Sequence, residues 1–317
     1  MSSDAAITVA IATYNGRHLL EATLPSFAAQ THPGIQLLVV DDGSTDGTAD
    51  WLAERWPQVR LVRHASNRGV TAALNSCLSA AGTQLVGLFN NDVELAPDCI
   101  AELVAALRRH PEAAAAGPKL LAYEDRGRID GAGDIYSWVG SGWRRGHGEP
   151  DRGQFDAPCA VFGICGGAAV LRRKALAAVG GFDEAFFAFY EDVDWSFRAQ
   201  LAGFSIRYVP SAIAYHMGSA TLGRGATDFM RYHVTRNAIW VVAKDWPAGA
   251  ILRHAHQLAH LQLANLTAAL RARRMAVHLR AWRDAVRGLP AMLRKRRVVQ
   301  RSRAVGARQL EAVVGER

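Results

Sequence analysis

The 317-residue sequence has few cysteines, no long apolar run and no leader-like N-terminus. Its four cysteines, Cys77, Cys99, Cys159 and Cys165, form no CxxC spacing, which argues against a zinc site and predicts reduced, buried thiols. Residues 1–6 lack a basic region followed by an apolar stretch, so we expect no signal peptide. No apolar run reaches the roughly 20 residues that span a bilayer. These absences predict a cytoplasmic protein that is not integral to a membrane.

Net positive charge is confined to the C-terminal part of the chain. Residues 271–317 carry 14 of the 37 Arg and Lys side chains and only three acids, a net charge of +11. Because the whole chain has a net charge of +8, the first 270 residues sum to −3. Such an asymmetry indicates a binding partner for the tail and says little about the fold.

The first third of the chain alternates between strand-like and helix-like segments. Apolar, strand-like segments lie at 7–12, 35–40, 58–63 and 84–89, and helix-like segments lie at 17–30, 44–55, 69–81 and 97–109. This alternation predicts a doubly wound α/β fold with a mainly parallel sheet. In such sheets ligands bind beyond the carboxyl ends of the strands. The polar loops 13–16, 41–46 and 90–94 follow those ends, so we expect them to meet in one cleft.

The rest of the chain is less regular. Residues 123–158 predict a long excursion with a hairpin around 135–147. A strand at 166–171 and a helix ending near residue 179 follow, then a helix at 191–202 and a short strand at 205–209. From about residue 226 onward the pattern is helical. We therefore expect a catalytic domain over residues 1–225, divided near residue 122, and a helical, basic extension over residues 226–317.

Three carboxylates occur within four residues, at Glu191, Asp192 and Asp194, among several aromatic side chains. Removing a charge from water is unfavourable, so carboxylates among aromatics are usually paired, bound to a metal or catalytic. The first turn of a surface helix is an alternative, because acidic residues suit that position. The cluster alone leaves both interpretations open.

Three other polar motifs have the same ambiguity. Asp41 and Asp42 precede a tight Gly-Ser turn and could accept hydrogen bonds from ribose or a base, although turn formation also explains them. Asp92, in Asn90-Asn91-Asp92, could hold a divalent cation against a diphosphate, but it too suits a turn. His216 is a ligand candidate only if its loop returns to the same cleft.

Together the motifs resemble the family 2 inverting glycosyltransferases, which have the GT-A fold. The resemblance covers roughly residues 5–245. It is carried, in family order, by Thr13-Tyr14-Asn15-Gly16, Val39-Val40-Asp41-Asp42-Gly43-Ser44-Thr45-Asp46, Asn67-Arg68-Gly69, Asn90-Asn91-Asp92, Gly166-Gly167-Ala168 and Tyr190-Glu191-Asp192-Val193-Asp194-Trp195. The chain is most similar to the rhamnosyltransferase-like branch that builds bacterial cell-wall and surface polysaccharides.

The resemblance implies a role for each motif. Asp192 would be the catalytic base, and Asp92 with His216 would hold Mg²⁺ or Mn²⁺. The nucleotide-sugar donor would contact Ala12, Thr13, Tyr14, Asp41, Asp42, Asn67, Arg68, Asn90 and Asn91. The sugar and acceptor pocket would include Gly166, Gly167, Ala168, Glu191, Asp194 and Trp195. The implied donor is thymidine diphosphate-rhamnose or a UDP-sugar, and the implied acceptor is a saccharide or a lipid-linked saccharide.

These residue types suit an inverting transfer. A carboxylate must remove the proton of the acceptor hydroxyl, and aromatic neighbours would raise the pKa of Asp192 toward neutral pH. A divalent cation would stabilise the leaving diphosphate as a Lewis acid. One position departs from the family motif, because the first residue of the acidic DxD pair is Asn90. An amide brings no charge, so we expect weaker metal binding than two acids would give.

The tail and two alternative functions complete the sequence-based hypotheses. Segments 251–270 and 273–293 have apolar residues at helical spacing with interspersed arginines. This pattern predicts peripheral attachment to the anionic inner face of the cell membrane, or else a solvated face of a helical subdomain. A sugar nucleotidyltransferase would need a glycine-rich, basic phosphate loop, which residues 13–16 lack. A nucleic-acid-binding protein would explain the arginines but not the acids at strand ends, so we expect no nucleic-acid partner.

Overall fold

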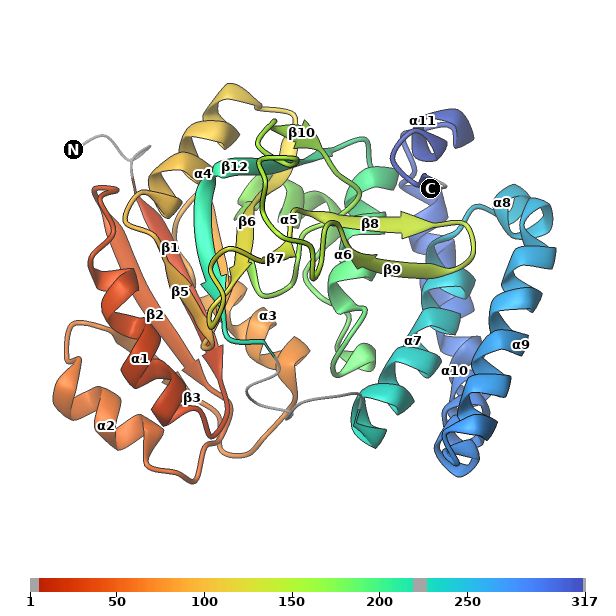
Figure 1. Cartoon of the computed structure of the whole chain (residues 1–317), viewed down its shortest axis with the longest axis horizontal. Coiled ribbons are helices and arrows are strands. Elements are labelled where there is room, and N and C mark those ends of the chain that lie inside the picture. Colours follow the sequence, from red (N-terminus) through yellow and green to blue (C-terminus); the bar gives the residue numbers. More distant parts are fainter. Residues whose placement is uncertain (1–5, 219–226, 316–317) are drawn as a thin grey trace.

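The computed structural model describes residues 6–218 and 227–315 (Figure 1). Its first part alternates as the sequence predicts. The elements are β1 (Ile7–Thr13), α1 (Arg17–Ala28), β2 (Ile35–Asp41), α2 (Thr48–Arg55), β3 (Arg60–Arg63), α3 (Val70–Ala80) and β4 (Leu85–Asn90). β1 pairs in parallel with both β2 and β4, and β2 pairs in parallel with β3. The loops after β1, β2 and β4 therefore leave the same edge of the sheet.

The second part of the chain completes this sheet and adds a small separate one. Its elements are β5 (Val93–Leu95), α4 (Cys99–Arg109), β6 (Ala113–Ala122), β7 (Ile129–Gly131), β8 (Asp134–Ser137), β9 (Ser141–Arg144), β10 (Cys159–Ala160), β11 (Ala168–Arg172), α5 (Arg173–Val179), the 3₁₀ turn η2 (Glu184–Phe186), α6 (Glu191–Leu201) and β12 (Ser205–His216). The main strand order is β10-β12-β6-β11-β4-β1-β2-β3, and β8 and β9 form a separate two-stranded sheet. β11 is antiparallel to β4 and β6, whereas β12 runs parallel to β6.

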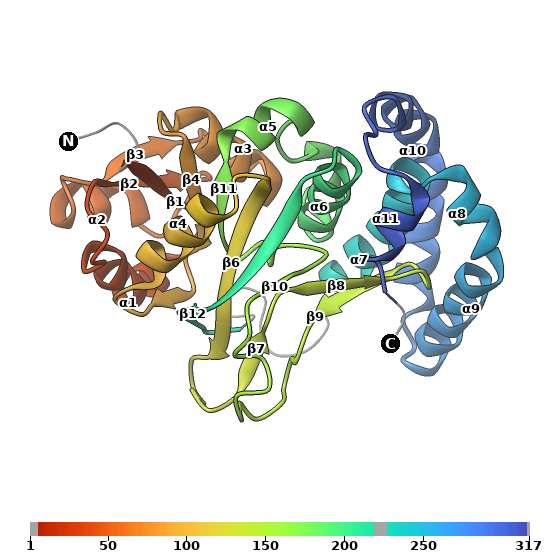
Figure 2. The same ribbon diagram turned by 90° about the horizontal axis from the view of Figure 1, so that it is seen from above.

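Helices cover both faces of the main sheet (Figure 2). Leu20 and Leu24 of α1 and Leu103 of α4 belong to the core on one face. Leu74 of α3 and Trp195 of α6 belong to the core on the other face. This double cover explains why the strands are apolar runs without alternation, since both of their faces are buried. The predicted doubly wound fold is confirmed.

The C-terminal helices are α7 (Asp228–Asp245), α8 (Ala248–Arg253), α9 (Ala255–Arg271), α10 (Met275–Arg301) and α11 (Ala307–Glu311). α7 and α10 pack against each other, and α7 lies beside α6 (Figures 1 and 2). A third core joins Tyr136 and Phe197 of the catalytic part to Trp240 and Trp246 of the helices. The predicted division at residues 225–226 lies outside the described residues and stays a prediction.

Two strands differ from the sequence-based expectation. No strand was expected at 113–122, yet β6 is central in the sheet, because four buried alanines leave room for α4 and carry little strand propensity of their own. The strand expected at 205–209 continues to His216 as β12, past a register shift between Val209 and Ile213. The predicted hairpin around 135–147 is confirmed as β8 and β9.

Candidate active site

Predicted donor residues meet at the carboxyl ends of β1, β2 and β4. The strand register places Thr13 beside Asp41, and Ala12 beside Asn90. Asp41 is fully buried; its Oδ1 accepts a hydrogen bond from the Ser44 N–H, and its Oδ2 has no hydrogen-bond partner. The guanidinium of Arg63 approaches this oxygen, with its Nε 3.7 Å from Oδ2, so the charge of Asp41 is partly balanced while the oxygen can still accept a hydrogen bond.

Asp42 holds the next loop in place. Its carboxylate accepts hydrogen bonds from the backbone N–H groups of Arg68 (3.0 Å) and Gly69 (2.9 Å). His64 Nδ1 lies 2.6 Å from Asp42 Oδ1. These contacts show that Asp42 orders the loop that carries Arg68 and Gly69. The sequence interpretation gave Asp42 only a role in binding the nucleobase or ribose. They also bring Asn67 and Arg68 to the donor side of the site.

The loops after β1 and β4 are tied together by side chains. Asn91 Nδ2 donates to Thr13 Oγ1 over 2.8 Å. A Cβ at Gly16 would lie 2.0 Å from Asn91 Nδ2, so only glycine fits beside this contact. Tyr14 is exposed at the rim, where its ring is free to meet a ligand. The two asparagine-containing loops therefore form one wall of the site.

Asp92 and His216 meet, although 124 positions separate them in the sequence. His216 Nε2 lies 3.4 Å from Asp92 Oδ2, and its Nδ1 lies 2.9 Å from Asp130 Oδ2. Arg144 of β9 contacts Asp130 and approaches His216 Nδ1 within 3.3 Å. Burial lowers the pKa of His216, but its bonds to Asp130 and Asp92 outweigh this and raise the pKa to about 9.

This group has the chemistry of a cation site. Asp130 orients the His216 ring by its Nδ1, which leaves Nε2 directed toward Asp92, as in metal sites where a carboxylate supports the histidine ligand. Asp92 Oδ1 is buried without a hydrogen-bond partner. Among the described residues no cluster of three acidic, histidine or cysteine ligands is present. Mg²⁺ is commonly held by one or two protein ligands together with substrate phosphates, so two ligands fit that use.

Asp192 is the second residue of α6. It is half-buried, and its Oδ2 accepts the Gly166 N–H over 3.0 Å. Burial raises the pKa of Asp192, while hydrogen bonds from the Val193 and Gly166 N–H groups and the charge of Arg144 oppose the rise. The direction agrees with the predicted effect of the aromatic surroundings and favours proton abstraction near neutral pH.

Arg144 lies near both Asp192 and His216. Its charge acts on Asp192 and on Asp134 of β8, and it contacts Asp130. Burial and the charge of Asp192 raise the pKa of Asp134 to about 8. Asp134 and Asp192 resist being ionised together because their negative charges repel, although Arg144 favours the charged form of each. The β8–β9 hairpin thus supplies titratable groups to both sides of the site.

The predicted acceptor residues divide into two groups. Gly166 and Gly167 face Asp192 and Asn90, because a Cβ on them would lie 2.9 Å from Asp192 Oδ2 and 3.1 Å from Asn90 Nδ2. Ala168 follows as the first residue of β11. Glu191 is buried next to Asp192, and burial with that neighbouring charge raises its pKa to about 8.

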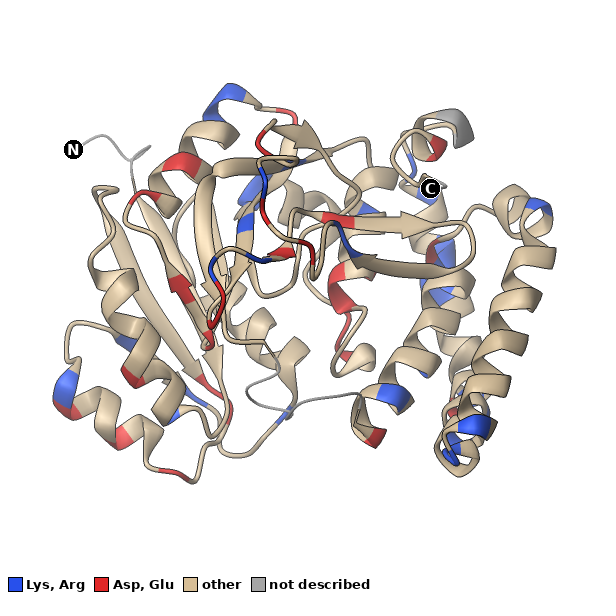
Figure 3. Ribbon diagram, in the orientation of Figure 1, with Lys and Arg blue, Asp and Glu red and all other residues tan. Residues whose placement is uncertain are grey.

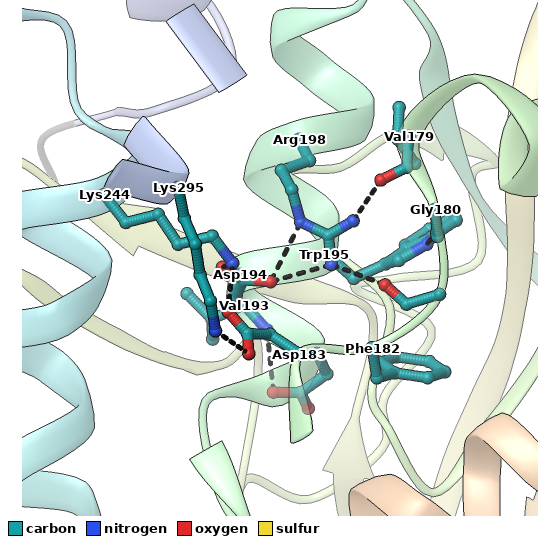
Figure 4. Close-up of polar contacts among 12 residues, drawn as sticks. Val179, Gly180, Phe182, Asp183, Val193, Asp194, Trp195, Arg198, Lys244 and Lys295 are labelled. Atoms are coloured by element: carbon teal, nitrogen blue, oxygen red, sulfur yellow. Dashed lines mark hydrogen bonds and ion pairs between the residues drawn. The ribbon is translucent and has the colours of Figure 1, made fainter. Parts of the chain in front are cut away.

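Asp194 and Trp195 belong to the interior instead. Both are fully buried; Asp194 pairs with Arg198 and Lys244, and Trp195 Nε1 donates to the Gly180 carbonyl (Figure 4). Each residue on an α-helix is turned by about 100° from the one before it. Asp194 is therefore turned by about 200° from Asp192 and points away from it. Their positions favour a structural role over the predicted contact with an acceptor.

The sequence interpretation gave no role to His64, Asp130, Asp134 or Arg144. Asp130 and Arg144 lie in the irregular 123–158 segment, 86 and 72 positions from the histidine that they contact. No local spacing connects them to His216. Figure 3 shows acidic residues, in red, at the carboxyl ends of the first strands and at the start of α6.

Comparison with known proteins identifies the family. The model of glycosyl transferase family 2 matches residues 8–180, more than half of the chain. The chain belongs to glycosyl transferase family 2. It is 30% identical over 251 residues to the N-acetylglucosaminyl-diphospho-decaprenol L-rhamnosyltransferase of Mycobacterium tuberculosis (strain ATCC 25618 / H37Rv), covering 72% of this chain and 81% of the relative. The resemblance seen in the motifs is confirmed, and this family 2 member is a glycosyltransferase.

Solved structures confirm the GT-A fold of this glycosyltransferase. The mannosyltransferase PcManGT from Pyrobaculum calidifontis, in complex with GDP-Man and Mn²⁺, superimposes with a TM-score of 0.56 at 21% identity, over 93% of this chain and 85% of that one. GalNAc-T7 with UDP, GalNAc and Mn²⁺ superimposes with a TM-score of 0.62 at 18% identity, over 77% of this chain and 48% of that one. At these identities the likeness concerns the fold.

A separate cleft of about 640 Å³ lies between α4, β12 and the 151–158 loop. Its lining includes Arg109, Lys119 and Arg207. Lys119 is buried between Asp151 and Asp156, which satisfy its charge. None of the residues predicted for the donor, metal or base lines this cleft.

Of the helices described, none is both long and apolar enough to cross a bilayer.

Proposed function

We propose that this glycosyltransferase inverts the anomeric centre of a nucleoside-diphosphate sugar, with Asp192 as the base. The observation that supports the proposal is the contact of His216 with Asp92 together with Arg144, which approaches His216 Nδ1 within 3.3 Å and whose charge acts on Asp192. Asp192 takes the proton of the acceptor hydroxyl as that oxygen bonds to the anomeric carbon. The bond from the same carbon to the diphosphate oxygen breaks, and the electron pair leaves with the nucleoside diphosphate.

The chain's own residues would hold the donor and the proton. The strand-end loops with Thr13, Asp41 and Asn91 bind the nucleotide, and the rigid Gly166–Gly167 turn lets the sugar approach Asp192 closely. Asp92 and His216, oriented by Asp130, would hold Mg²⁺ or Mn²⁺. When bound, the cation supplies Lewis-acid stabilisation of charge on the diphosphate. Mn²⁺ in the two similar solved structures supports this assignment.

The donor and the acceptor are narrower proposals. The similar solved structures contain UDP or GDP-Man, and the M. tuberculosis relative is named as an L-rhamnosyltransferase. We propose a thymidine diphosphate-rhamnose or UDP-sugar donor. The same relative is named for a diphospho-decaprenol substrate, which supports a saccharide or lipid-linked saccharide acceptor in surface polysaccharide synthesis.

Donor turnover by the purified chain tests the function. A panel of nucleotide sugars is incubated with Mn²⁺, and the release of nucleoside diphosphate and the melting temperature are measured. We expect one donor to be turned over, and Asp192→Asn to lower its turnover about 100- to 10,000-fold while donor affinity stays within a few-fold. Normal turnover in Asp192→Asn would refute the assignment of Asp192 as the base. If no nucleotide sugar raises the melting temperature of the protein, the proposal of a nucleotide-sugar donor is refuted.

The surface of the C-terminal helices supports a membrane partner. Residues 246–283 contain six arginines and no acidic residue. Leu252, Leu263 and Leu270 expose 79%, 59% and 66% of their surface on α8 and α9, and Arg271 and Arg273 follow at the end of α9. Figure 3 shows basic residues at the turn between α9 and α10. Exposed leucines beside arginines fit the headgroup region of an anionic bilayer.

Vesicle flotation tests this partner with point variants of the full chain. Truncation after α7 is unsuitable, because α10 residues such as Ala285 and Met292 belong to the third core. We expect Leu263→Glu/Leu270→Glu to lose binding to phosphatidylglycerol vesicles and to keep donor turnover. Leu293→Glu on α10 serves as an exposed control. The membrane partner would be contradicted if the double variant floated as well as the wild type, or if the wild type bound neutral vesicles as well as phosphatidylglycerol vesicles.

A further inference from the structure

The turn that leads into α6 has an unusual backbone. Phe187, Phe189 and Tyr190 have φ angles of 65°, 62° and 66°. Side chains other than glycine rarely adopt this region, and each such residue is unfavourable on its own. Asp192 follows two residues after this turn. Contacts from elsewhere in the fold must therefore impose the turn. Because α6 starts directly after the turn, these contacts also fix the position of Asp192.

Asn237 of α7 supplies such contacts. Its Nδ2 lies 3.1 Å, 2.9 Å and 2.7 Å from the carbonyl oxygens of Phe186, Ala188 and Phe189, to which it donates. Asn237 is fully buried, so water does not replace these bonds. One amide thus gathers the carbonyl groups on both sides of Phe187. The bonds stabilise a backbone conformation that the aromatic residues would not adopt alone.

Lys244, two turns further along α7, joins the two ends of the same segment. Its Nζ lies 2.8 Å from Asp183 Oδ2, just before η2, and it contacts Asp194 Oδ1 within α6 (Figure 4). Lys295 of α10 contacts the other oxygen of Asp183. Both ends of residues 183–194 are therefore attached to helices that follow the catalytic domain in the sequence.

The attachment is ionic and buried. Lys244 and Asp194 have almost no exposed surface, and Arg198 donates to Asp194 Oδ2 from Nη2 (2.7 Å) and Nε (2.9 Å). Burial raises the pKa of Asp183, but Lys244 and Lys295 outweigh it and hold this pKa at about 2. Removing one partner of a buried ion pair leaves an unpaired charge, which is strongly unfavourable. The segment is therefore held in one position.

We infer that α7 positions the catalytic base, with Asn237 and Lys244 as positioning residues that hold the 183–190 turn and α6 so that Asp192 faces the acceptor. The inference rests on the proposed role of Asp192. It gives the C-terminal helices a part in the reaction that is separate from any contact with lipid. Neither residue is in the donor loops after β1, β2 and β4. The turn that they hold meets the donor side through Glu184, which lies 3.8 Å from Arg68, and through the Phe187 carbonyl, which accepts the Thr71 N–H over 3.4 Å. The larger effect should therefore appear in turnover, with a smaller one on nucleotide binding.

Kinetics of Asn237→Ala and Lys244→Met, made in the full chain, test this separation. We expect kcat for the donor found in the panel to fall about tenfold or more, because a shift of about 1 Å at the base has effects of that size. The affinity for the matching nucleoside diphosphate, measured by calorimetry, should stay within about threefold. Lys174→Met on exposed α5 and Asn265→Ala on α9 are matched controls that should keep wild-type kcat.

Hydrogen exchange gives a readout that needs no substrate. We expect the amides of residues 183–194 to exchange at least tenfold faster in both variants, while those of the donor loops 13–16 and 41–46 exchange as in the wild type. If either variant does not fold, Lys295→Met replaces it, since that lysine is 40% exposed and its loss should act in the same direction. Wild-type kcat and exchange in a folded variant would overturn the inference. An inactive wild-type chain with faster exchange in the variants would instead count against the proposed function.

Discussion

The donor loops and the segment that carries the base are built in different ways. In the donor half, Asp42 bonds to His64 and to the Gly69 N–H, 22 and 27 positions away, across adjacent strand–loop units. In the base segment, Asp183 reaches Lys244 and Lys295, 61 and 112 positions away. Consecutive strands place the donor loops side by side by topology alone. The segment that carries Asp192, the proposed base, is held by side chains from a later part of the chain.

This difference makes two kinds of defect separable. Substitutions on the donor and metal side should act on nucleotide and cation binding. Substitutions on the base side should act on turnover or on the stability of the 183–194 segment. The comparison fails if both kinds of substitution change the same measured quantity to the same degree.

Loss of Asp92 should have the largest effect. Asp92→Ala removes the carboxylate beside His216 Nε2, so we expect Mn²⁺-dependent nucleotide affinity to fall about 100-fold, as in other metal sites that lose a supporting group. Calorimetric titration with nucleoside diphosphate, with and without Mn²⁺, measures this. Asp50→Ala, at an exposed position on α2, is the control. An unchanged Mn²⁺ titration would discredit the cation site.

Loss of Asp183 should act on stability and depend on pH. The folded pKa is about 2, below the value near 3.9 of an unfolded aspartate, so the charged form stabilises the fold. That contribution, about 2 kcal/mol, is fully present above about pH 4 and is lost as pH falls toward 2. We expect Asp183→Asn to lower the free energy of unfolding by about this amount at pH 7 and by less at pH 3, measured in urea. A pH-independent difference would exclude the ionic contribution.

A methyl group at Gly166 should disturb the base directly. The new Cβ would lie 2.9 Å from Asp192 Oδ2 and 3.2 Å from Asp192 Cβ, so the carboxylate must move. We expect Gly166→Ala to lower kcat about tenfold with little change in nucleotide affinity. Gly82→Ala is the matched control, since nothing lies within 4 Å of its new Cβ. An equal fall in kcat in Gly166→Ala and Gly82→Ala would show that the effect does not come from displacement of the Asp192 carboxylate.

Restoring the acidic pair should have the smallest effect. Asn90→Asp adds a carboxylate next to the Asp92 loop, where divalent cations prefer charged oxygen ligands. We expect Mn²⁺ affinity in the presence of nucleotide to rise a few-fold. Asn265→Asp, on α9, controls for added negative charge. Unchanged affinity would place position 90 outside the reach of the cation.

Several parts of the site could be predicted from the sequence, and others could not. The alternating pattern of residues 7–109 predicted the parallel sheet, which the structure confirms, and the polar loops after β1, β2 and β4 leave the same edge of it. β6 was missed, since its alanines carry no strand signal. Asp194 was grouped with Asp192 by adjacency, although residues two apart on a helix point to different sides. Asp130, Arg144 and Asn237 came from segments with no motif.

The sequence by itself determined the class of fold, the family and the order in which the chemical groups appear along the chain. These follow from periodicity and short motifs, which act within a few residues. Only the tertiary structure decided which carboxylate faces the opening, what supports His216 and what holds the turn before α6. Those contacts join residues 48 to 112 positions apart, and their partners are set by packing against the sheet and the C-terminal helices, which no local pattern encodes.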